Sequence, residues 1–295
     1  MSFRYPQRTE PALRDVTRTV RAGERVALVG ANGAGTTTLV KVLTGLYRPT
    51  AGRVLYDGRD LAALDPAAVR DLQAAVFQDH VHYAYTLDEN VGYGRSERLD
   101  DPGAIAAAAA QGGADAVAQA LPQGYATLLT REFSGGTELS GGQWQRVAVS
   151  RGFMRDALLI VLDEPTAALD PQAEADVFRR FAAMAGGRTA MLVSHRLGSA
   201  RLCDRVLVQR EGRLAEQGTH DELVAAGGEY ARMWALQSQW YRGHARPTRR
   251  EGAVPAETPS TGYVRSEAPG CGCQPLSAET RRPVFGHEAL AVDVA

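Results

Sequence analysis

The chain contains little lysine, little cysteine and no excess of charge of either sign. Lys41 is its only lysine, and 33 basic against 34 acidic residues leave a net charge of −1. Such a chain has no bulk electrostatic attraction to nucleic acid or to anionic lipid. Three cysteines are too few and too unevenly spaced for a disulfide framework. Cys271 and Cys273 resemble a metal or redox pair, but no second pair or histidine cluster accompanies them in the sequence.

Long apolar segments are also missing from the sequence. No run approaches the roughly 18–20 apolar residues that a membrane-spanning helix needs. The longest runs, Ala104–Ala110 and Ala157–Leu162, have the size of a short helix and of a strand. Residues Met1–Arg8 lack the apolar stretch of a signal peptide. We therefore expect a cytosolic chain, or one held at a membrane by another protein.

The apolar residues that are present predict alternating strands and helices. With 44% hydrophobic residues, a chain of 295 residues suffices for one large or two modest domains. Short runs rich in β-branched residues predict buried parallel strands at Val26–Val29, Leu158–Leu162 and Ala190–Val193. Helical patterns follow them, one of them beginning at Pro171. This order favours an α/β fold with a mostly parallel, right-handed wound sheet.

Two stretches depart from this alternation. Between Gln78 and about Arg155, alanine-rich helical patterns interrupted by glycine replace the strand signals. We expect a helical subdomain there, at about residues 79–155, inserted in a folded unit of residues 3–239. From Tyr241 the composition shifts to Pro, Gly, Thr, Arg and Glu with little periodicity. Such a segment buries too little apolar surface to offset its ordering entropy, so we expect residues 241–295 to be disordered.

A glycine-rich turn follows the strand predicted at Arg25–Val29. Its sequence has the spacing of a phosphate loop, in which backbone amides and a helix N-terminus bind phosphate, and reads Gly30-Ala31-Asn32-Gly33-Ala34-Gly35-Thr36-Thr37. Thr37 stands where a hydroxyl would bind Mg²⁺, but position 36 is threonine where the motif has lysine. Lys41 lies about 7–8 Å further along the helix axis, so we do not expect it to replace that lysine. The turn alone leaves open a plain strand-to-helix connection.

Further along the chain lie two acidic residues, a second glycine-rich motif and a histidine. Asp163 and Glu164 end an apolar strand, which favours Mg²⁺ binding at Asp163 and a general base at Glu164, although acidic residues after strands are common. The run Leu139–Gln143 predicts a second anion site at a helix N-terminus, with a loop-forming role as the alternative. His195 follows a predicted strand at the edge where such sheets bind ligands, but a lone histidine is more often an ordinary polar residue.

Taken together, these motifs resemble the ATP-binding-cassette (ABC) family, over about residues 3–239. The matching order is phosphate loop, Gln78, Leu139-Ser140-Gly141-Gly142-Gln143, Asp163-Glu164, Ala168-Leu169-Asp170 and His195. Resemblance to exporter-type nucleotide-binding domains rests on Phe3-Arg4-Tyr5-Pro6, Val76-Phe77-Gln78-Asp79, Gln143-Trp144-Gln145-Arg146 and Gly218-Thr219-His220-Asp221-Glu222-Leu223. The resemblance implies a P-loop NTPase core with a mostly parallel sheet, an inserted helical subdomain and a small antiparallel β region.

The resemblance also implies a role for each matching position. Adenine of ATP would stack on Tyr5, and Thr37, Gln78 and Asp163 would hold Mg²⁺. Glu164 would be the catalytic base, His195 the γ-phosphate switch, and Gln78 a further catalytic residue that senses the metal and the attacking water. The other nucleotide contacts implied are Gly30, Asn32, Gly33, Ala34, Gly35, Thr36, Thr38, Ser140, Gly141, Gly142, Gln143 and Asp170. Of these, Ser140 and Gly142 would touch ATP held by an opposite subunit.

The partners implied are a transmembrane domain of an ABC exporter and a second nucleotide-binding domain in a head-to-tail dimer, with no nucleic acid. The transmembrane domain's coupling helix would dock at Gln78–Tyr85, where packing in the core is the alternative role of the aromatic residues. The chain would lie at the cytoplasmic face of the plasma (inner) membrane. Two features depart from the family pattern. Thr36 replaces the lysine, which favours a heterodimer with a normal partner. The chain also begins four residues before Tyr5, which leaves open a separate subunit, a fragment or a misplaced start.

Three functions fit the sequence to different degrees. The first is an ATP-hydrolysing subunit of a membrane transporter, in which ATP binding closes the dimer and hydrolysis reopens it. The alternative is a regulatory subunit that binds nucleotide with little ATPase activity, which the missing lysine favours and the intact Glu164 and His195 oppose. A soluble ABC protein acting on DNA or ribosomes is disfavoured, because the sequence shows no tandem cassette, zinc-binding insert or long coiled coil.

Overall fold

The larger sheet has six strands within residues 1–133, 135–165, 171–243 and 290–295, which are the parts of the chain that this computed structural model describes. Its strand order is β5 (Gln73–Val76), β6 (Leu159–Asp163), β7 (Thr189–Val193), β2 (Arg25–Gly30), β8 (Arg205–Arg210) and β9 (Arg213–Gly218). All neighbours pair in parallel except β8 and β9. Every residue of β6 and β7 is buried, as their apolar composition requires. The predicted α/β fold with a mostly parallel sheet is confirmed.

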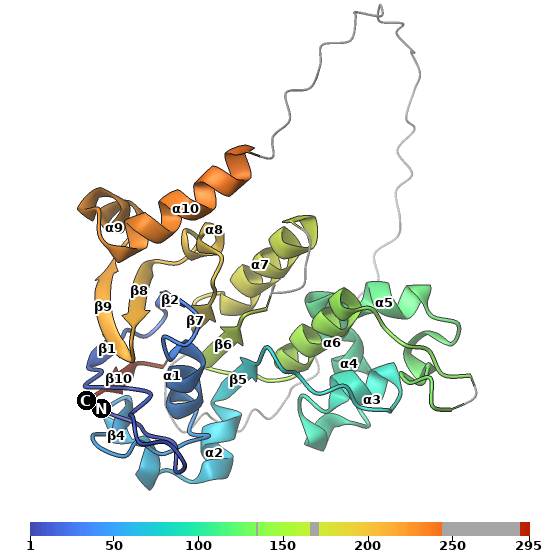
Figure 1. Cartoon of the computed structure of the whole chain (residues 1–295). Coiled ribbons are helices and arrows are strands. Elements are labelled where there is room, and N and C mark those ends of the chain that lie inside the picture. Colours follow the sequence, from blue (N-terminus) through green and yellow to red (C-terminus); the bar gives the residue numbers. More distant parts are fainter. Residues whose placement is uncertain (134, 166–170, 244–289) are drawn as a thin grey trace, which may run out of the picture.

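Helices cover both faces of this sheet (Figure 1). On one face, Leu39 of α1 shares a buried cluster with Val161 of β6 and with the small sheet. On the other face, Phe181 of α7 packs in a cluster with Ile160 of β6. The covering helices are α1 (Thr36–Leu43), α6 (Gly141–Phe153), α7 (Pro171–Ala185) and α8 (Leu197–Ala200).

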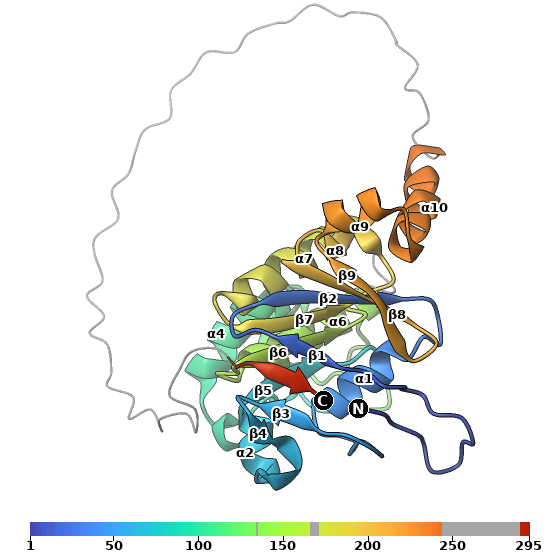
Figure 2. The same cartoon turned by 90° about the vertical axis from the view of Figure 1, so that its left-hand side faces the viewer.

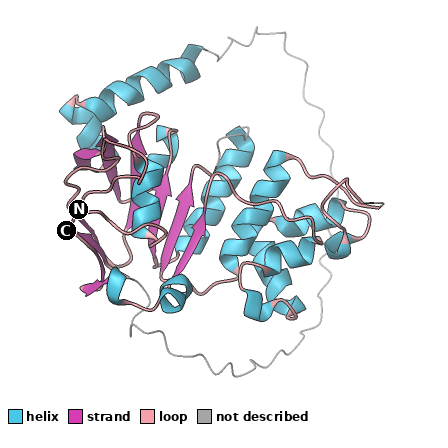
Figure 3. Ribbon diagram, turned by 60° about the horizontal axis from the view of Figure 1, so that its bottom comes forward, coloured by secondary structure: helices cyan, strands magenta, loops and turns pink. Residues whose placement is uncertain are grey.

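The chain between β5 and β6 forms helices with an apolar core of their own. These elements are α3 (Leu87–Gly92), η2 (Ser96–Arg98), α4 (Pro102–Gly112), α5 (Ala114–Ala120), η3 (Gly124–Ala126) and α6. Their core surrounds Trp144, which is 2% exposed. Close packing of α4 on α6 explains why residue 112 is a glycine, because a Cβ at Gly112 would lie 2.1 Å from the Ser150 hydroxyl oxygen. Figure 3 shows these helices set to one side of the strands.

A small antiparallel sheet lies beside α1, and its strand order is β1 (Arg18–Val20), β10 (Val292–Val294), β3 (Val54–Tyr56) and β4 (Arg59–Asp60). The expectation of disorder from residue 241 onward is therefore wrong for residues 290–295. Leu290, Val292 and Val294 alternate along this strand and are at most 6% exposed, so they are ordered by burial in the sheet's core. Figure 2 shows β10 between β1 and β3. Residues 244–289 lie outside the described part of the chain.

Four further helices belong to the described part of the chain. They are η1 (Leu61–Ala63), α2 (Pro66–Asp71), α9 (His220–Ala226) and α10 (Glu229–Gly243). Thr219 and Glu222 form a reciprocal capping box that starts α9. The last of these helices extends past the boundary expected at residue 241. Among the described residues, no helix has both the length and the apolar character needed to cross a membrane.

Candidate functional site

Four adjacent parallel strands end at one edge of the larger sheet, and a predicted site residue follows or ends each of them. Gln78 follows β5, Asp163 ends β6, His195 follows β7, and Gly30 ends β2. Ligands bind in such sheets outside the carboxyl ends of the strands. The fold therefore collects at one edge residues that lie far apart in the sequence.

A hollow of about 430 Å³ opens at this edge, and we call it the β2–α1 hollow. It is lined by Ala12, Asn32, Gly33, Gly35, Thr36, Thr37, Thr38, Gln78, Glu164 and His195. All of these except Ala12 are predicted site residues. Ala12 was missed because nothing in its sequence neighbourhood marks it, and it reaches the hollow only through the fold of the N-terminal segment.

The phosphate loop has the backbone that anion binding requires. Gly33 and Gly35 have φ of +80° and +100°, in the left-handed region that glycine adopts readily. A Cβ at Gly35 would lie 2.8 Å from the carbonyl oxygen of Ala12. No described side chain caps the first turn of α1, and that turn holds no acidic residue. The helix N-terminus therefore presents its amides and its positive dipole end to the hollow.

No arginine or lysine of the described chain lines the β2–α1 hollow. Thr36, at the position of the motif's lysine, is 5% exposed. Lys41 is not among the lining residues, although its charge lowers the pKa of Asp163 beside the hollow. The backbone amides of the loop and of the first turn of α1 therefore supply the anion-binding donors of the hollow.

Glu164 and His195 face each other across the edge of the sheet. His195 Nε2 lies 2.6 Å from Glu164 Oε1, and His195 Nδ1 lies 2.7 Å from the carbonyl oxygen of Gly30. Both ring nitrogens therefore lie within hydrogen-bond distance of an oxygen atom. Glu164 has φ of +49°, which is unusual for a residue with a side chain, and its amide donates to the carbonyl of Val193 at 3.0 Å. Such local strain is typical of functional sites.

Asp163 is a buried carboxylate, 1% exposed. Its two oxygens make no hydrogen bond of good geometry with the described residues, although the Thr37 hydroxyl is close enough to lower its pKa. Burial, and then the charge of Glu164, raises the pKa of Asp163 to about 6, while Thr37 and Lys41 act in the opposite direction. A divalent cation would supply the charge and the coordination that this carboxylate lacks. Asp163 with the oxygen donors Thr37 and Gln78 therefore fits Mg²⁺.

Tyr5 lies next to the loop without lining the β2–α1 hollow. Its hydroxyl is 3.2 Å from that of Thr38, and its ring packs edge-on against Phe3 at 4.9 Å and Tyr47 at 5.5 Å. Tyr47 is 39% exposed, so a second aromatic ring is available on this side of the loop. The sequence analysis did not single out Tyr47, because one tyrosine beyond a helix carries no motif of its own.

The signature residues Ser140–Gln143 lie outside the β2–α1 hollow. The Ser140 hydroxyl caps α6 by accepting from the amide of Gln143 at 3.4 Å, and the Gln143 side chain accepts from the amide of Ser140 at 2.8 Å. Ser140 and Gly141 are exposed. The structure does not bring them to the phosphate loop of the same chain. Asp170, also a predicted contact, lies outside the described residues.

The segment after Gln78 forms an exposed aromatic patch, which consists of Tyr83, Tyr85 and Tyr93. Their side chains are 37–45% exposed, and the three ring centroids lie 5.3–6.2 Å apart. The Arg151 guanidinium lies 5.0 Å from the Tyr83 ring centroid and donates to the carbonyl of Val81 at 2.6 Å. Arg151 belongs to α6, so the patch is tied to the helix that begins at the signature.

The chain is similar to known proteins in both sequence and structure. Residues 13–167 match the family model described as ABC transporter. The chain is 38% identical over 233 residues to the subtilin transport ATP-binding protein of Bacillus subtilis, covering 79% of this chain and 38% of that protein. It is 40% identical over 238 residues to the ATP-dependent lipid A-core flippase of Cupriavidus pinatubonensis, covering 80% and 40%.

A solved structure is similar as well. It is described as a bacterial Atm1-family ABC exporter with ATP bound, and it matches with a TM-score of 0.73 and 36% identity, covering 84% of this chain and 41% of that one. The chain thus spans about two fifths of the length of these relatives. Since the family model covers more than half of the 295 residues, the chain belongs to the ABC transporter family.

Proposed function

We propose that this chain is the ATP-binding, ATP-hydrolysing part of an exporter-type ABC transporter, and that dimer closure on ATP drives a membrane partner. The observation that carries the proposal is the β2–α1 hollow, where the phosphate loop, Gln78, Glu164 and His195 meet beside the buried Asp163. The similarity to a lipid A-core flippase, a subtilin transport protein and an Atm1-family exporter supports the same function. The cargo would be determined by the membrane partner.

Residues in and beside the hollow would each have a separate role in phosphoryl transfer. Amides of Gly33 and Gly35 and the first turn of α1 would bind the phosphates, and Tyr5 would stack on adenine. Thr37, Gln78 and Asp163 would hold Mg²⁺, which when bound neutralises charge on the β- and γ-phosphates. Together these residues would hold ATP and Mg²⁺ beside Glu164.

Glu164 and His195 would act in sequence. In the structure the Glu164 carboxylate contacts His195 Nε2 at 2.6 Å, so neither group is free to serve a nucleotide. The γ-phosphate would take the place of Glu164 at His195, because a phosphate oxygen accepts the same proton. Glu164 would then be free to accept a proton from the attacking water. We infer that this exchange couples nucleotide binding to activation of the base.

The exposed signature of one chain would complete the site of another. Ser140 and Gly142 lie outside the β2–α1 hollow of their own chain, which supports a head-to-tail dimer. In a homodimer both sites would carry Thr36, whereas a partner with the lysine would form one fully equipped site with this chain's signature. We therefore favour a heterodimer, docked through the aromatic patch on a transmembrane domain at the cytoplasmic face of the membrane.

A second candidate function is a regulatory subunit that binds ATP and hydrolyses it poorly. The observation that favours it is the lack of any lysine or arginine among the described residues that line the hollow. A phosphate-loop lysine donates charge-assisted hydrogen bonds worth roughly 1.5–3 kcal/mol each. Without them ATP affinity should fall about 10- to 100-fold. Turnover should fall further, since charge builds on the γ-phosphoryl oxygens in the transition state.

The experiment that separates the two functions is a lysine replacement. ATP affinity and turnover are measured for the parent chain, Thr36→Lys, and Thr36→Lys combined with Glu164→Gln. We expect Thr36→Lys to raise both quantities and Glu164→Gln to abolish the regained turnover. If the parent chain has no turnover and Thr36→Lys does not create it, the ATPase proposal fails. Turnover by the parent chain contradicts the regulatory alternative. Fast hydrolysis by the parent homodimer would contradict the preference for a heterodimer.

A further inference from the structure

The middle position of the small sheet is occupied by the C-terminal residues of the chain. On one side of β10, Val294 pairs with Arg18 of β1, and on the other side it pairs with Val54 of β3, both antiparallel. Figure 2 shows β10 as the red arrow between these strands. Without residues 290–295, β1 and β3 would be separated by an open strand position.

The first residues of the chain continue the same strand. Met1 exchanges backbone hydrogen bonds with Val16, at 2.7 Å and 2.8 Å, and Ser2 bridges to Ala51. Ala295 exchanges them with Arg53, at 2.8 Å and 3.1 Å. A Cβ at Gly52, between Ala51 and Arg53, would lie 2.4 Å from the Ala295 oxygen and 2.7 Å from the Met1 Cα. Residues 292–295 and then 1–2 therefore face residues 56–51 in unbroken register.

The strand position selects its occupant by side chain as well as by backbone. Leu290, Val292 and Val294 are buried in the core that holds Phe3 and Tyr56. The intervening Ala291 and Asp293 are partly exposed. This alternation is what a strand with one buried face requires.

Polar groups next to β10 are also matched. The amide of Ala291 donates to Asp57 Oδ1 at 2.8 Å, and its carbonyl accepts from the Asp57 amide at 3.0 Å. The carbonyl of Leu290 accepts from the Thr189 hydroxyl of β7, which joins the segment to the larger sheet. Backbone groups on both sides of the segment are thus satisfied, as in an interior strand.

We propose that the groove between β1 and β3 is a strand-binding seat, and that residues 290–295 fill it as a separable strand of the same chain. The seat accepts an extended segment with apolar residues at alternate positions, antiparallel to both neighbours. Because the register runs on to Met1, a strand joined ahead of Met1 would follow the path of residues 292–295. The seat therefore holds one strand at a time, and the C-terminal strand competes for it with any other segment of this pattern.

A strand in the seat also supports residues beside the phosphate loop. Val292 and Val294 share a core with Phe3, and Phe3 packs edge-on against Tyr5 at 4.9 Å. A strand that leaves the seat removes support from the tyrosine expected to stack on adenine. The C-terminal end of the chain is by this path connected to the phosphate-loop region.

A disulfide tests the register and the origin of the strand. Residues Thr19 and Asp293 are paired on the outer face. Counting from the hydrogen-bonded Met1–Val16 pair, the alternation of an antiparallel ladder makes them a non-hydrogen-bonded pair, whose close side chains suit a disulfide. In full-length protein with its three native cysteines replaced by serine, Thr19→Cys with Asp293→Cys should cross-link within one chain on oxidation. The control, Thr19→Cys with Val294→Cys, places the sulfurs on opposite faces and should not.

Each other result of that experiment has a defined meaning. If Thr19→Cys with Asp293→Cys forms no cross-link, the proposal of a strand-binding seat is wrong. A cross-linked dimer in place of the monomer means that a second copy supplies the strand, and overturns its assignment to the same chain. Equal cross-linking of the control pair contradicts the register.

A transplanted strand tests whether the seat accepts a segment from the other end. Val292→Asp with Val294→Asp should lower the midpoint of thermal unfolding of the full chain by roughly 5–10 °C, because two buried positions become charged. Repeating the sequence of Leu290–Ala295 directly ahead of Met1 in that variant should restore most of the loss. The same addition with aspartate at its two valine positions is the control and should not. If the apolar addition restores nothing more than its control, the seat proposal is wrong.

Discussion

Burial and negative charge conflict at Asp163, and the substitution Asp163→Asn separates the two. Without divalent cation, we expect the variant to raise the free energy of unfolding by about 1–2 kcal/mol, because it removes a buried charge whose desolvation Thr37 and Lys41 offset only in part. The same variant should lose the stabilisation that Mg²⁺-ATP gives the parent chain. Thermal unfolding with and without Mg²⁺-ATP measures both effects. Asp156→Asn, at an exposed position, should change neither, and an Asp163→Asn variant that is less stable without cation would contradict this account.

The local residues of the candidate site were predictable, and those contributed by distant packing were not. Short sequence motifs contain Gly33, Gly35 and Glu164. The residues next to each of them in the sequence already predict the turn or the strand in which it lies. Ala12 lines the hollow only because the N-terminal segment folds back on the phosphate loop. Tyr47 lies near the loop through its ring contact with Phe3 of the same N-terminal segment. The contact of Glu164 with His195 also joins two motifs, and neither motif alone predicts it.

Among the elements, β10 is a strand that the average composition of its segment does not predict. The segment after residue 241 is on average polar and rich in Gly and Pro, which predicts disorder for the whole of it. The last six residues alternate apolar and smaller or polar side chains, a pattern of period two. So short a pattern is a weak signal alone, and it becomes a strand because β1 and β3 supply hydrogen bonds on both sides. The parallel strands β2, β6 and β7 needed no such context, since their apolar runs predict burial directly.

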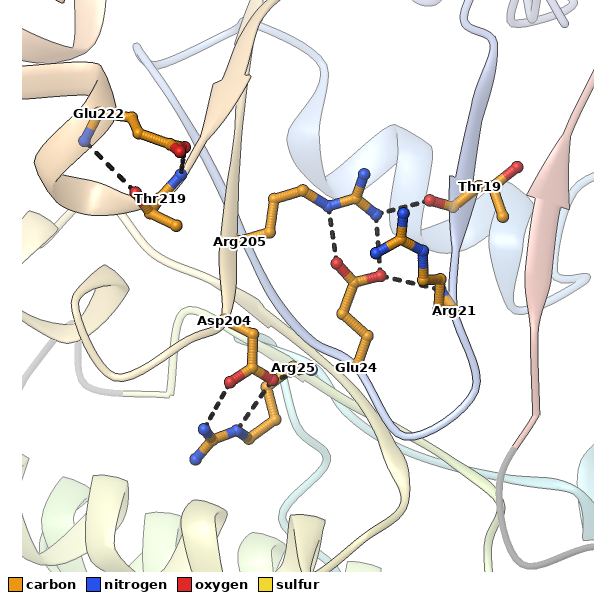
Figure 4. Close-up of polar contacts among 8 residues, drawn as sticks. All are labelled: Thr19, Arg21, Glu24, Arg25, Asp204, Arg205, Thr219 and Glu222. Carbon is orange, nitrogen blue, oxygen red and sulfur yellow. Dashed lines mark hydrogen bonds and ion pairs between the residues drawn. The ribbon is translucent and has the colours of Figure 1, made fainter.

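At the opposite end of β2 from the phosphate loop, an ion pair ties three elements together (Figure 4). The Arg205 guanidinium lies 2.8 Å from Glu24 Oε1 and donates to the carbonyl of Thr19 at 2.6 Å. Glu24 also accepts from the amide of Arg21 at 2.8 Å. The two side chains are 22% and 11% exposed, so solvent screens them little. The pair joins β1, the turn before β2, and the start of β8.

We expect Glu24→Gln to lower the free energy of unfolding by about 1–3 kcal/mol, because Arg205 keeps its charge and loses its counter-ion. Glu10→Gln is the matched control. It breaks the Glu10–Arg14 pair at 2.7 Å, where the glutamate is 77% exposed, and should cost less than about 0.5 kcal/mol. Urea unfolding of both variants measures the difference. Equal costs would mean that the half-buried pair has no special role in joining the elements.

At the scale of the whole molecule, the aromatic patch is the surface that we propose docks on a membrane-domain partner. Tyrosine combines an apolar ring with a polar group, as interfaces favour. We expect Tyr83→Ala with Tyr85→Ala to weaken association with the membrane partner at least 10-fold and to leave ATP affinity unchanged. Co-purification and nucleotide titration measure the two quantities. Leu236→Ala, at a position 66% exposed on α10, is the control for loss of an exposed apolar group. A drop in ATP affinity with association intact would refute the docking assignment.

The position of Ser140 outside its own chain's hollow has a kinetic consequence. A complete catalytic site would take its phosphate loop from one chain and its signature from another. The amount of bound ATP would then be proportional to the chain concentration, whereas the rate of hydrolysis would be proportional to its square. In dilute solution the rate of hydrolysis should then fall with the square of the chain concentration, while the fraction of chains that bind ATP stays the same. A membrane partner that holds two domains side by side would replace that concentration by a fixed effective one, and the dependence would vanish.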